Sequence, residues 1–382
     1  MIYKSLIVNK EVNEKVLSFY KKNHLPNAFL FYGNEGIGKE AHAIEFFSFM
    51  NCKSPNLDSA CGECSSCKKV KLLQHELLSI TVPLPRSKTY KKNSSVINCL
   101  SSKDRENLIL QFEEKGQNPY SKIKLDKANT IILNSIKDIR NNINLSIPKD
   151  SVKVHLILEA EKLCYPNKES ANALLKILEE PKKNNLFILV TSDISKIIDT
   201  ILSRCTLLFF PNIKKEKIKK HLLDKNIDKN KAEIISKLCF GNIRKASELI
   251  NSFDVEINIV ENLILSIINK DLKKWQSNFH NMDKEDILNM FNFLIVFFRD
   301  LKNYSVNKII CYDNFENYYK KITLEYPNHI WLECLTSINN SYNYILRNGY
   351  SKLIILSLFI EISSLFKNKN FDKFKLNEWI TQ

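Results

Sequence analysis

Short apolar runs alternate with helical periodicity between about residues 28 and 210 of the chain. The runs AFLFY, VHLILEA and LFILVTS are nearly continuous apolar segments, which is typical of strands buried on both faces of a parallel sheet. Between the runs lie stretches such as KESANALLKILEE, which repeat apolar residues at helical spacing and end before Pro181. This alternation predicts an α/β domain with a parallel sheet over residues 1–210.

The pattern changes after Pro211, where helical periodicity continues without comparable strand signals. Residues 211–253, which contain CFGNIRKASELI, are predicted to form a small helical unit. Amphipathic stretches such as DILNMFNFLIVFFRDL predict an all-helical domain over residues 254–382. Within the first domain, residues 83–126 are rich in Ser, Lys, Asn and Gln, so we expect an inserted loop there.

Composition and charge narrow the class of protein only slightly. The 44% hydrophobic and 26% charged content is that of an ordinary globular protein. No apolar run is long enough to cross a bilayer, and the N-terminus lacks a secretory signal pattern, so we expect a cytoplasmic protein with no membrane partner. The net charge of +15 fits a polyanionic partner or a general enrichment in lysine, and both interpretations stay open.

A glycine-rich loop follows the first predicted strand in the stretch FLFYGNEGIGKE, residues 29–40. Gly33, Gly38 and Lys39 match the nucleotide-binding P-loop, in which backbone N–H groups and a lysine hold phosphates, and Gly36 is a third glycine of the same predicted site. Glu40 stands where a Ser or Thr would hold magnesium, and its carboxylate is expected to repel a triphosphate. The loop is therefore predicted to keep the P-loop shape without the magnesium ligand.

The strand that supplies catalytic carboxylates in motor ATPases has its counterpart in HLILEAEKL, residues 155–163. Glu159 and Ala160 occupy the two acidic positions, and alanine cannot polarise water. Glu161 comes one residue later and is expected to point to the opposite side of an extended strand. Two separate departures thus predict that the chain does not hydrolyse ATP.

Four of the ten cysteines are clustered, with the spacing C-x8-C-x2-C-x2-C at Cys52, Cys61, Cys64 and Cys67. Four thiolates at such short spacings predict a structural zinc site within residues 52–67, closed to catalysis because every ligand position is filled by protein. A chance cluster and a nucleic-acid-binding knuckle are the alternatives.

The order of these motifs resembles that of the bacterial clamp-loader subunits of the AAA+ class. The resemblance covers residues 25–250 and rests on the P-loop region, the cysteine spacing, ANALLKILEEP, TSD, ILSRC and GNIRKA. It implies an AAA+ α/β domain followed by a helical lid and a helical collar. It also implies gamma/tau and delta subunits as partners, with the sliding clamp and primed DNA reached through the assembled complex.

Within that family, the degenerate P-loop and the Glu159–Ala160 pair match the non-hydrolysing delta-prime pattern. The resemblance implies that Arg204, in Ser-Arg-Cys, is an arginine finger that reaches ATP on a neighbouring motor subunit; a plain surface arginine is the alternative. Thr191 and Arg244 fall at the two sensor positions. Weak ATP binding through Lys39 stays open.

Two other functions compete with this interpretation. A gamma/tau-like ATPase with unusual magnesium ligands is the first. A zinc-containing nucleic-acid-binding protein unrelated to replication is the second, and it predicts salt-sensitive DNA affinity in the isolated chain.

Overall fold

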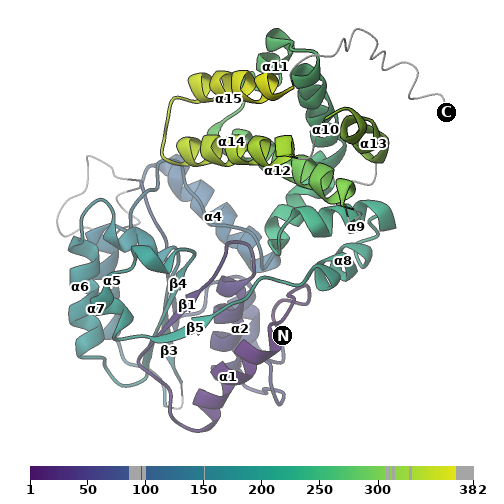
Figure 1. Cartoon of the computed structure of the whole chain (residues 1–382). Coiled ribbons are helices and arrows are strands. Elements are labelled where there is room, and N and C mark those ends of the chain that lie inside the picture. The colour runs from purple at the N-terminus through teal and green to yellow at the C-terminus, as the bar shows by residue number, and fades with distance from the viewer. Residues whose placement is uncertain are drawn as a thin grey trace. The chain divides into compact units, whose positions relative to one another are not determined.

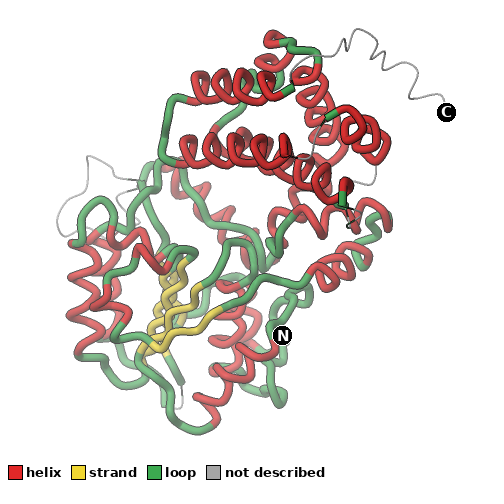
Figure 2. Tube along the Cα trace, in the orientation of Figure 1, coloured by secondary structure: helices red, strands yellow, loops and turns green. Residues whose placement is uncertain are grey.

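The chain divides into two compact units, which are described separately (Figure 1). The computed structural model describes residues 1–85, 96, 100–149, 151–306, 308, 310–311, 315–326 and 329–366. Unit 1 comprises Met1–Asn226 and Cys239–Lys245, and unit 2 comprises Ile227–Leu238 and Ala246–Gln382. All the strands among the described residues lie in unit 1 (Figure 2).

The core of unit 1 is a five-stranded sheet in the order β2-β3-β4-β1-β5, in which every pair of neighbours is parallel. The strands are β1 Ala28–Tyr32, β2 Leu78–Thr81, β3 Lys153–Ile157, β4 Asn185–Thr191 and β5 Thr206–Phe209. Every residue of β4 is buried, as expected for the middle strand of a sheet covered on both faces. The predicted α/β class with a parallel sheet is confirmed.

Helices cover both faces of this sheet (Figure 1). On one face, α1 (Lys10–Lys21) and α2 (Lys39–Met50) pack against the aromatic side of β1, where Phe29 contacts Phe19 and Phe46 at ring distances of 5.6 and 6.2 Å. On the other, Leu30 lies in an apolar cluster with α5 (Leu133–Ile143), α6 (Glu169–Glu179) and α7 (Asp199–Leu202). Successive side chains of β1 therefore point to opposite faces of the sheet.

The region predicted as an inserted loop is partly helical, so this expectation is wrong for residues 102–117. They form α4, Ser102–Gln117, whose first turn is capped by the Ser101 side chain accepting from the Asp104 N–H. The helix was missed because its sequence is mostly polar and shows only a weak apolar face. Residues 86–95 and 97–99 of the expected insert lie outside the described residues.

The strands predicted at AFLFY and LFILVTS are confirmed as β1 and β4, and the helix predicted at KESANALLKILEE as α6. The strand predicted at VHLILEA is shorter than expected, because β3 ends at Ile157 and a 3₁₀ helix, η2, occupies Ala160–Cys164. The edge strand β2 was not predicted. The remaining short elements of unit 1 are α3 Ser65–Lys71, η3 Ile194–Lys196 and α8 Lys215–Leu223.

Unit 2 is helical throughout its described residues, which confirms the predicted helical C-terminal region. Its helices are α9 Lys229–Leu238, most of α10 Ile243–Ile268, α11 Leu272–Ser277, α12 Lys284–Ser305, α13 Glu316–Glu325, α14 His329–Leu346 and α15 Ser351–Leu365. Buried aromatic residues hold them together; the Trp275 indole N–H, for example, donates to Ile355 O at 3.0 Å. The boundary expected at residue 253 falls inside α10, and the separate lid and collar stay predictions.

The buried middle of the sheet should dominate the stability of unit 1. Leu189 lies on β4 with no exposed surface, whereas Leu207 on the edge strand β5 is 41% exposed. We expect Leu189→Ala to lower the free energy of unfolding by about 3 kcal/mol, because it leaves a cavity in a packed core. The matched variant Leu207→Ala should lower the free energy of unfolding by less than about 1 kcal/mol. Urea unfolding followed by circular dichroism checks both values, and equal losses would contradict this account of the core.

Candidate functional site

The loop after β1 has the conformation of a phosphate-binding loop. Gly33, Gly36 and Gly38 all have positive φ angles, of 145°, 66° and 88°, which side-chain-bearing residues rarely adopt. Gly38 leads directly into α2, whose first residue is Lys39. The sequence therefore positions N–H groups and a lysine at a helix N-terminus, as the motif predicted.

Lys39 is engaged by its own loop. Its ammonium donates to Gly33 O at 2.7 Å and to Asn34 O at 2.5 Å, and the residue is 5% exposed. Burial lowers the pKa of this ammonium to about 8, and the neighbouring carboxylates of Glu40 and Glu35 oppose that shift. The lysine that holds outer phosphates in a working P-loop here caps two carbonyl groups.

Glu40 is neutralised by a lysine from α4. The Lys115 ammonium pairs with the Glu40 carboxylate and also donates to Pro119 O at 3.1 Å and Ser121 O at 2.7 Å. These three acceptors satisfy all three ammonium protons of a side chain that is only 1% exposed. The expectation that Glu40 would present a repelling carboxylate to a triphosphate is therefore corrected: the charge is already paired inside the protein.

The electrostatics of this pair favour the charged carboxylate. Burial by itself would raise the pKa of Glu40, but the cations of Lys115 and Arg244 outweigh it and hold that pKa below its usual range. Burial also lowers the pKa of Lys115, and Glu40 opposes this shift. An ionised Glu40 next to a fully hydrogen-bonded ammonium is the arrangement that a buried ion pair requires.

A second set of ion pairs joins the P-loop to the segment that follows α4 and to the start of α10. Glu35 accepts from Lys122 at 2.9 Å and lies 3.8 Å from Arg244. Lys122 also pairs with Glu159 at 3.3 Å, and the Arg244 Nε–H donates to Tyr120 O at 2.7 Å. Arg244, at the predicted sensor position, thus holds the segment 115–122, which we call the plug.

The plug leaves almost no space in the P-loop pocket. The cavity that remains has a volume of about 20 Å³, which is room for about one water molecule. It is lined by the loop, by the plug and by residues beyond them: Glu35, Gly36, Gly38, Lys39, Glu40, Lys115, Pro119, Tyr120, Lys122, Glu159, Val190, Ser192 and Arg244. The plug therefore narrows the space in which the motif would hold phosphates.

The two carboxylates that follow β3, those of Glu159 and Glu161, both have partners within the chain. Glu159 adopts a left-handed conformation with φ 50°, and Ala160 is fully buried. Glu161 lies on η2 rather than on a strand, so the expectation based on strand alternation is wrong. Its carboxylate accepts from the Thr191 hydroxyl at 2.6 Å. Thr191, at the other predicted sensor position, is buried and joins η2 to the end of β4.

Arg204 lies apart from this pocket, between α7 and β5. Its Nη2 pairs with Glu179 of α6 at 2.7 Å, and its Nη1 donates to Thr200 O at 2.8 Å. The side chain is 34% exposed. The structure places this arginine on the surface and does not bring it to the chain's own P-loop.

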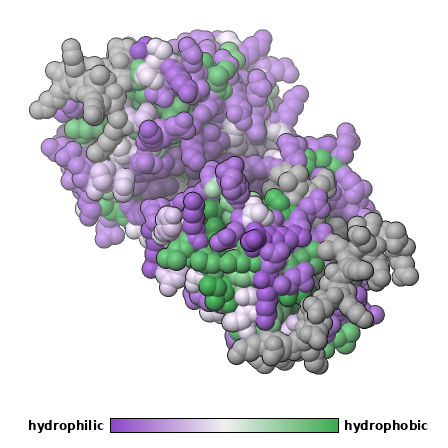
Figure 3. Space-filling view, turned by 90° about the horizontal axis from the view of Figure 1, so that it is seen from above, coloured by the Kyte–Doolittle hydropathy of each residue, from purple (hydrophilic) through white to green (hydrophobic). Residues whose placement is uncertain are grey.

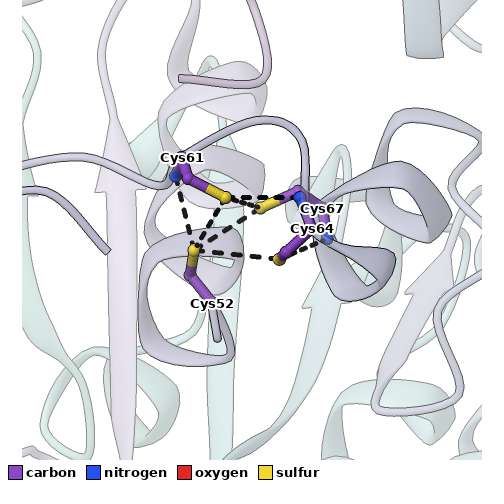
Figure 4. A group of neighbouring side chains, drawn as sticks. All are labelled: Cys52, Cys61, Cys64 and Cys67. Atoms are coloured by element: carbon purple, nitrogen blue, oxygen red, sulfur yellow. Dashed lines mark hydrogen bonds between the residues drawn. The ribbon is translucent and has the colours of Figure 1, made fainter. Parts of the chain in front are cut away.

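The four clustered cysteines converge as predicted (Figure 4). Their sulfur atoms all lie within 4.8 Å of one another; Cys52 Sγ is 3.5 Å from Cys61 Sγ and 3.6 Å from Cys67 Sγ. A tetrahedron with metal–sulfur bonds of about 2.3 Å has edges of about 3.8 Å, so the donor set fits zinc. These residues would hold the ion as a closed structural site.

The backbone around the cluster favours thiolates at one position. The N–H groups of Glu63 and Cys64 point at Cys61 Sγ at 3.4 and 3.3 Å. These donors lower the pKa of the Cys61 thiol to about 6, whereas burial raises the pKa of Cys67 to about 12. Metal binding to the cluster would be accompanied by release of protons from its thiols, which is the usual coupling of metal binding to proton release.

Comparison with known proteins identifies the family. The sequence model of the family described as DNA polymerase III, delta subunit, matches residues 8–214. The chain belongs to this family. The resemblance to the DNA polymerase III subunits is thereby confirmed, and it argues against a nucleic-acid-binding protein unrelated to replication.

Curated relatives agree with this assignment. The chain is 28% identical over 255 residues to the gamma subunit of Buchnera aphidicola subsp. Schizaphis graminum, covering 65% of this chain and 57% of that protein. It is 24% identical to the tau subunit of Bacillus subtilis, covering 77% and 46%, and 26% identical to the delta' subunit of the same organism, covering 63% and 60%. The chain thus spans about half the length of these relatives.

A solved structure of a DNA polymerase III gamma subunit-related protein from Thermotoga maritima covers 79% of this chain and 100% of its own. It has a TM-score of 0.34 at 15% identity, too low to add to the family argument. The AAA+ fold class of unit 1 agrees with the parallel sheet and the P-loop after β1. Among the helices in the described ranges, none combines the length and the apolar character that spanning a membrane requires.

Sequence reasoning missed the plug. Lys115, Tyr120 and Lys122 lie in the region predicted as a loop, and nothing in their local pattern marks them as part of the site. The signal that could have found them is Glu40 itself: a carboxylate at the start of a buried helix requires a cation, and the lysines of the predicted insert were the available donors.

The cysteine cluster should bind a single zinc ion in the purified chain. We expect Cys64→Ser to abolish this binding, because three thiolates do not complete the tetrahedral site. The matched variant Cys164→Ser, outside the cluster, should keep it. Metal analysis after dialysis checks the stoichiometry. Zinc retained at full occupancy by Cys64→Ser would contradict the assignment.

The Glu40–Lys115 pair should contribute strongly to stability as a pair. Glu40→Ala should lower the free energy of unfolding by about 3–5 kcal/mol, since it leaves a buried ammonium without its carboxylate. The double variant Glu40→Ala/Lys115→Met should lose less free energy of unfolding than the sum of the two single variants. The difference, which is the coupling energy, should be about 1–3 kcal/mol.

Urea unfolding of the four proteins of this cycle measures the coupling. The control is the surface pair Lys21–Asp58, whose side chains are 48% and 68% exposed. Its coupling energy should stay below about 1 kcal/mol. A Glu40–Lys115 coupling energy no larger than that of Lys21–Asp58 would show that the buried pair does not hold the plug in place.

Proposed function

We propose that the chain is a non-hydrolysing, delta-prime-like subunit of a bacterial clamp loader. In this role it assembles in the cytoplasm with gamma/tau and delta subunits, and the complex places a sliding clamp on primed DNA. Family membership supports the clamp-loader part of this proposal. The names of the relatives, gamma, tau and delta', support a role beside sister subunits.

The filled P-loop pocket is the observation that carries the non-hydrolysing part. A motor subunit must hold a triphosphate and magnesium in this space and polarise a water molecule. Here Lys39 caps its own loop, Glu40 is paired with Lys115, and a buried alanine occupies an acidic position. ATP binding would require the plug to leave and the buried Glu40–Lys115 pair to break, so binding is expected to be weak.

Arg204 supplies the proposed contribution to catalysis in trans. A guanidinium stabilises the charge that develops on a transferring phosphoryl group, and it can act from a neighbouring subunit. The pair with Glu179 and the bond to Thr200 O hold the side chain in one orientation while leaving 34% of it exposed. This subunit would therefore lend an arginine to a motor without using nucleotide itself.

Unit 2 is proposed to be the part that assembles with sister subunits. Large apolar side chains are exposed along its last two helices: Tyr344, Leu346, Tyr350, Leu353 and Ile360. Figure 3 shows apolar positions gathered on one part of the visible face, between hydrophilic ones. Exposed apolar surface of this kind is typical of subunit interfaces.

A gamma/tau-like ATPase is the second candidate, because gamma and tau subunits are among the relatives. It requires the plug to withdraw and Glu40 to support magnesium. Turnover by the isolated chain separates the two candidates: the delta-prime-like role expects none, and the motor role expects turnover that depends on Lys39.

The arginine is tested in a reconstituted ring with the gamma/tau and delta subunits of the same organism. Arg204→Ala in this chain should slow turnover at the adjacent motor site by about 10³-fold, the usual effect of removing an arginine finger. Total ATP turnover of the ring should therefore fall by the fraction that this motor site contributes. Arg140→Ala, on the exposed side of α5, is the matched control and should leave turnover unchanged. If the rings with Arg204→Ala and Arg140→Ala have equal turnover, Arg204 does not act as an arginine finger.

A further inference from the structure

The first nine residues run from the cysteine cluster to the P-loop, and we call them the strap. At its start, the Met1 backbone nitrogen donates to Ala60 O at 2.5 Å. A side chain at Gly62 would have its Cβ 2.7 Å from Met1 O, so the strap lies directly against the backbone of the knuckle, residues 52–67. The beginning of the strap is therefore held by the residues on both sides of Cys61.

The middle of the strap holds the plug. The Tyr3 N–H donates to the buried Glu45 carboxylate of α2 at 2.6 Å, and the Tyr3 hydroxyl donates to Lys115 O at 2.9 Å. Farther along, the Ile7 N–H donates to the Tyr120 hydroxyl at 2.7 Å. Lys115 and Tyr120 of the plug are thus both hydrogen-bonded to one short segment whose start lies on the knuckle.

The strap ends at the P-loop itself. The Asn9 N–H donates to His42 Nε2 at 3.0 Å, and the other ring nitrogen of His42 lies 2.8 Å from Gly38 O. His42 is buried, so this bridge is shielded from water. The strap therefore contacts the knuckle, the plug and the phosphate-binding loop in succession.

A second route joins the knuckle to the plug through α3. This helix carries Cys67 and is capped by the Cys64 sulfur, which accepts from the Cys67 N–H at 3.5 Å. Its last residue, Lys71, lies so close to α4 that a Cβ at Gly116 would overlap the Lys71 carbonyl oxygen. Gly116 adjoins Lys115, so the end of α3 positions the lysine that pairs with Glu40.

We propose that the metal-loaded knuckle seats the plug in the P-loop pocket, and that loss of the metal releases it. The knuckle has a short polar loop in place of an apolar core, and such elements depend on metal binding to stay folded. Without the ion, Ala60, Gly62 and α3 lose their fixed positions, and both routes to Lys115 loosen. The cysteine cluster is then a structural control on whether the pocket is closed.

This inference does not rest on the proposed function, since it concerns contacts within unit 1 alone. Hydrogen exchange with mass spectrometry on the full chain tests it, comparing zinc-loaded protein with protein treated with a chelator. We expect amides of residues 113–122 to exchange at least about tenfold faster after zinc removal, while β4 stays unchanged. Faster exchange limited to the knuckle, with unchanged plug amides, would overturn the proposal.

A variant tests the strap with the metal in place. Tyr3→Phe removes the hydrogen bond to Lys115 O without changing the cluster, so zinc content should stay constant while plug amides exchange faster. Tyr20→Phe is the matched control, because the Tyr20 hydroxyl donates to Met50 O at 3.4 Å and does not contact the plug. If the two variants have equal plug exchange, the strap does not transmit the state of the knuckle.

Discussion

The buried pair between Glu40 and Lys115 is the interaction on which the account of this site depends. A carboxylate at the start of a P-loop helix is unfavourable beside phosphates, and a buried ammonium is unfavourable alone. Together, with two backbone carbonyls completing the ammonium's hydrogen bonds, they form a satisfied pair. The pair fixes the end of α4 inside the pocket, and the outer ion pairs of Glu35, Lys122 and Arg244 follow from that position.

The other residues of the nucleotide-binding motifs also have structural partners inside the chain. Lys39 caps the carbonyls of Gly33 and Asn34 in the sharply turned loop. Thr191 and Arg244 likewise keep structural partners, the Glu161 carboxylate and Tyr120 O. Each side chain that would act on a nucleotide in a motor subunit is hydrogen-bonded within the chain.

Much of this arrangement could be predicted from local sequence. The glycine loop, the four cysteines and Ala160 stand within short motifs whose geometry is set by neighbouring residues, and the parallel sheet follows from its apolar runs. The plug could not be predicted, because Glu40 and Lys115 are 75 positions apart and α4 has little apolar periodicity. The position of Glu161 also depended on where β3 ends, and strand ends are set by packing rather than by the local pattern.

The central claim is that the chain's own lysine occupies the nucleotide pocket. Calorimetric titration of magnesium-ATP into the isolated full chain tests it most directly. The account predicts no saturable binding up to about 1 mM nucleotide, which corresponds to a binding free energy weaker than about −4 kcal/mol. Saturable binding at micromolar concentration would contradict it, because the plug would then have to leave the pocket at little cost.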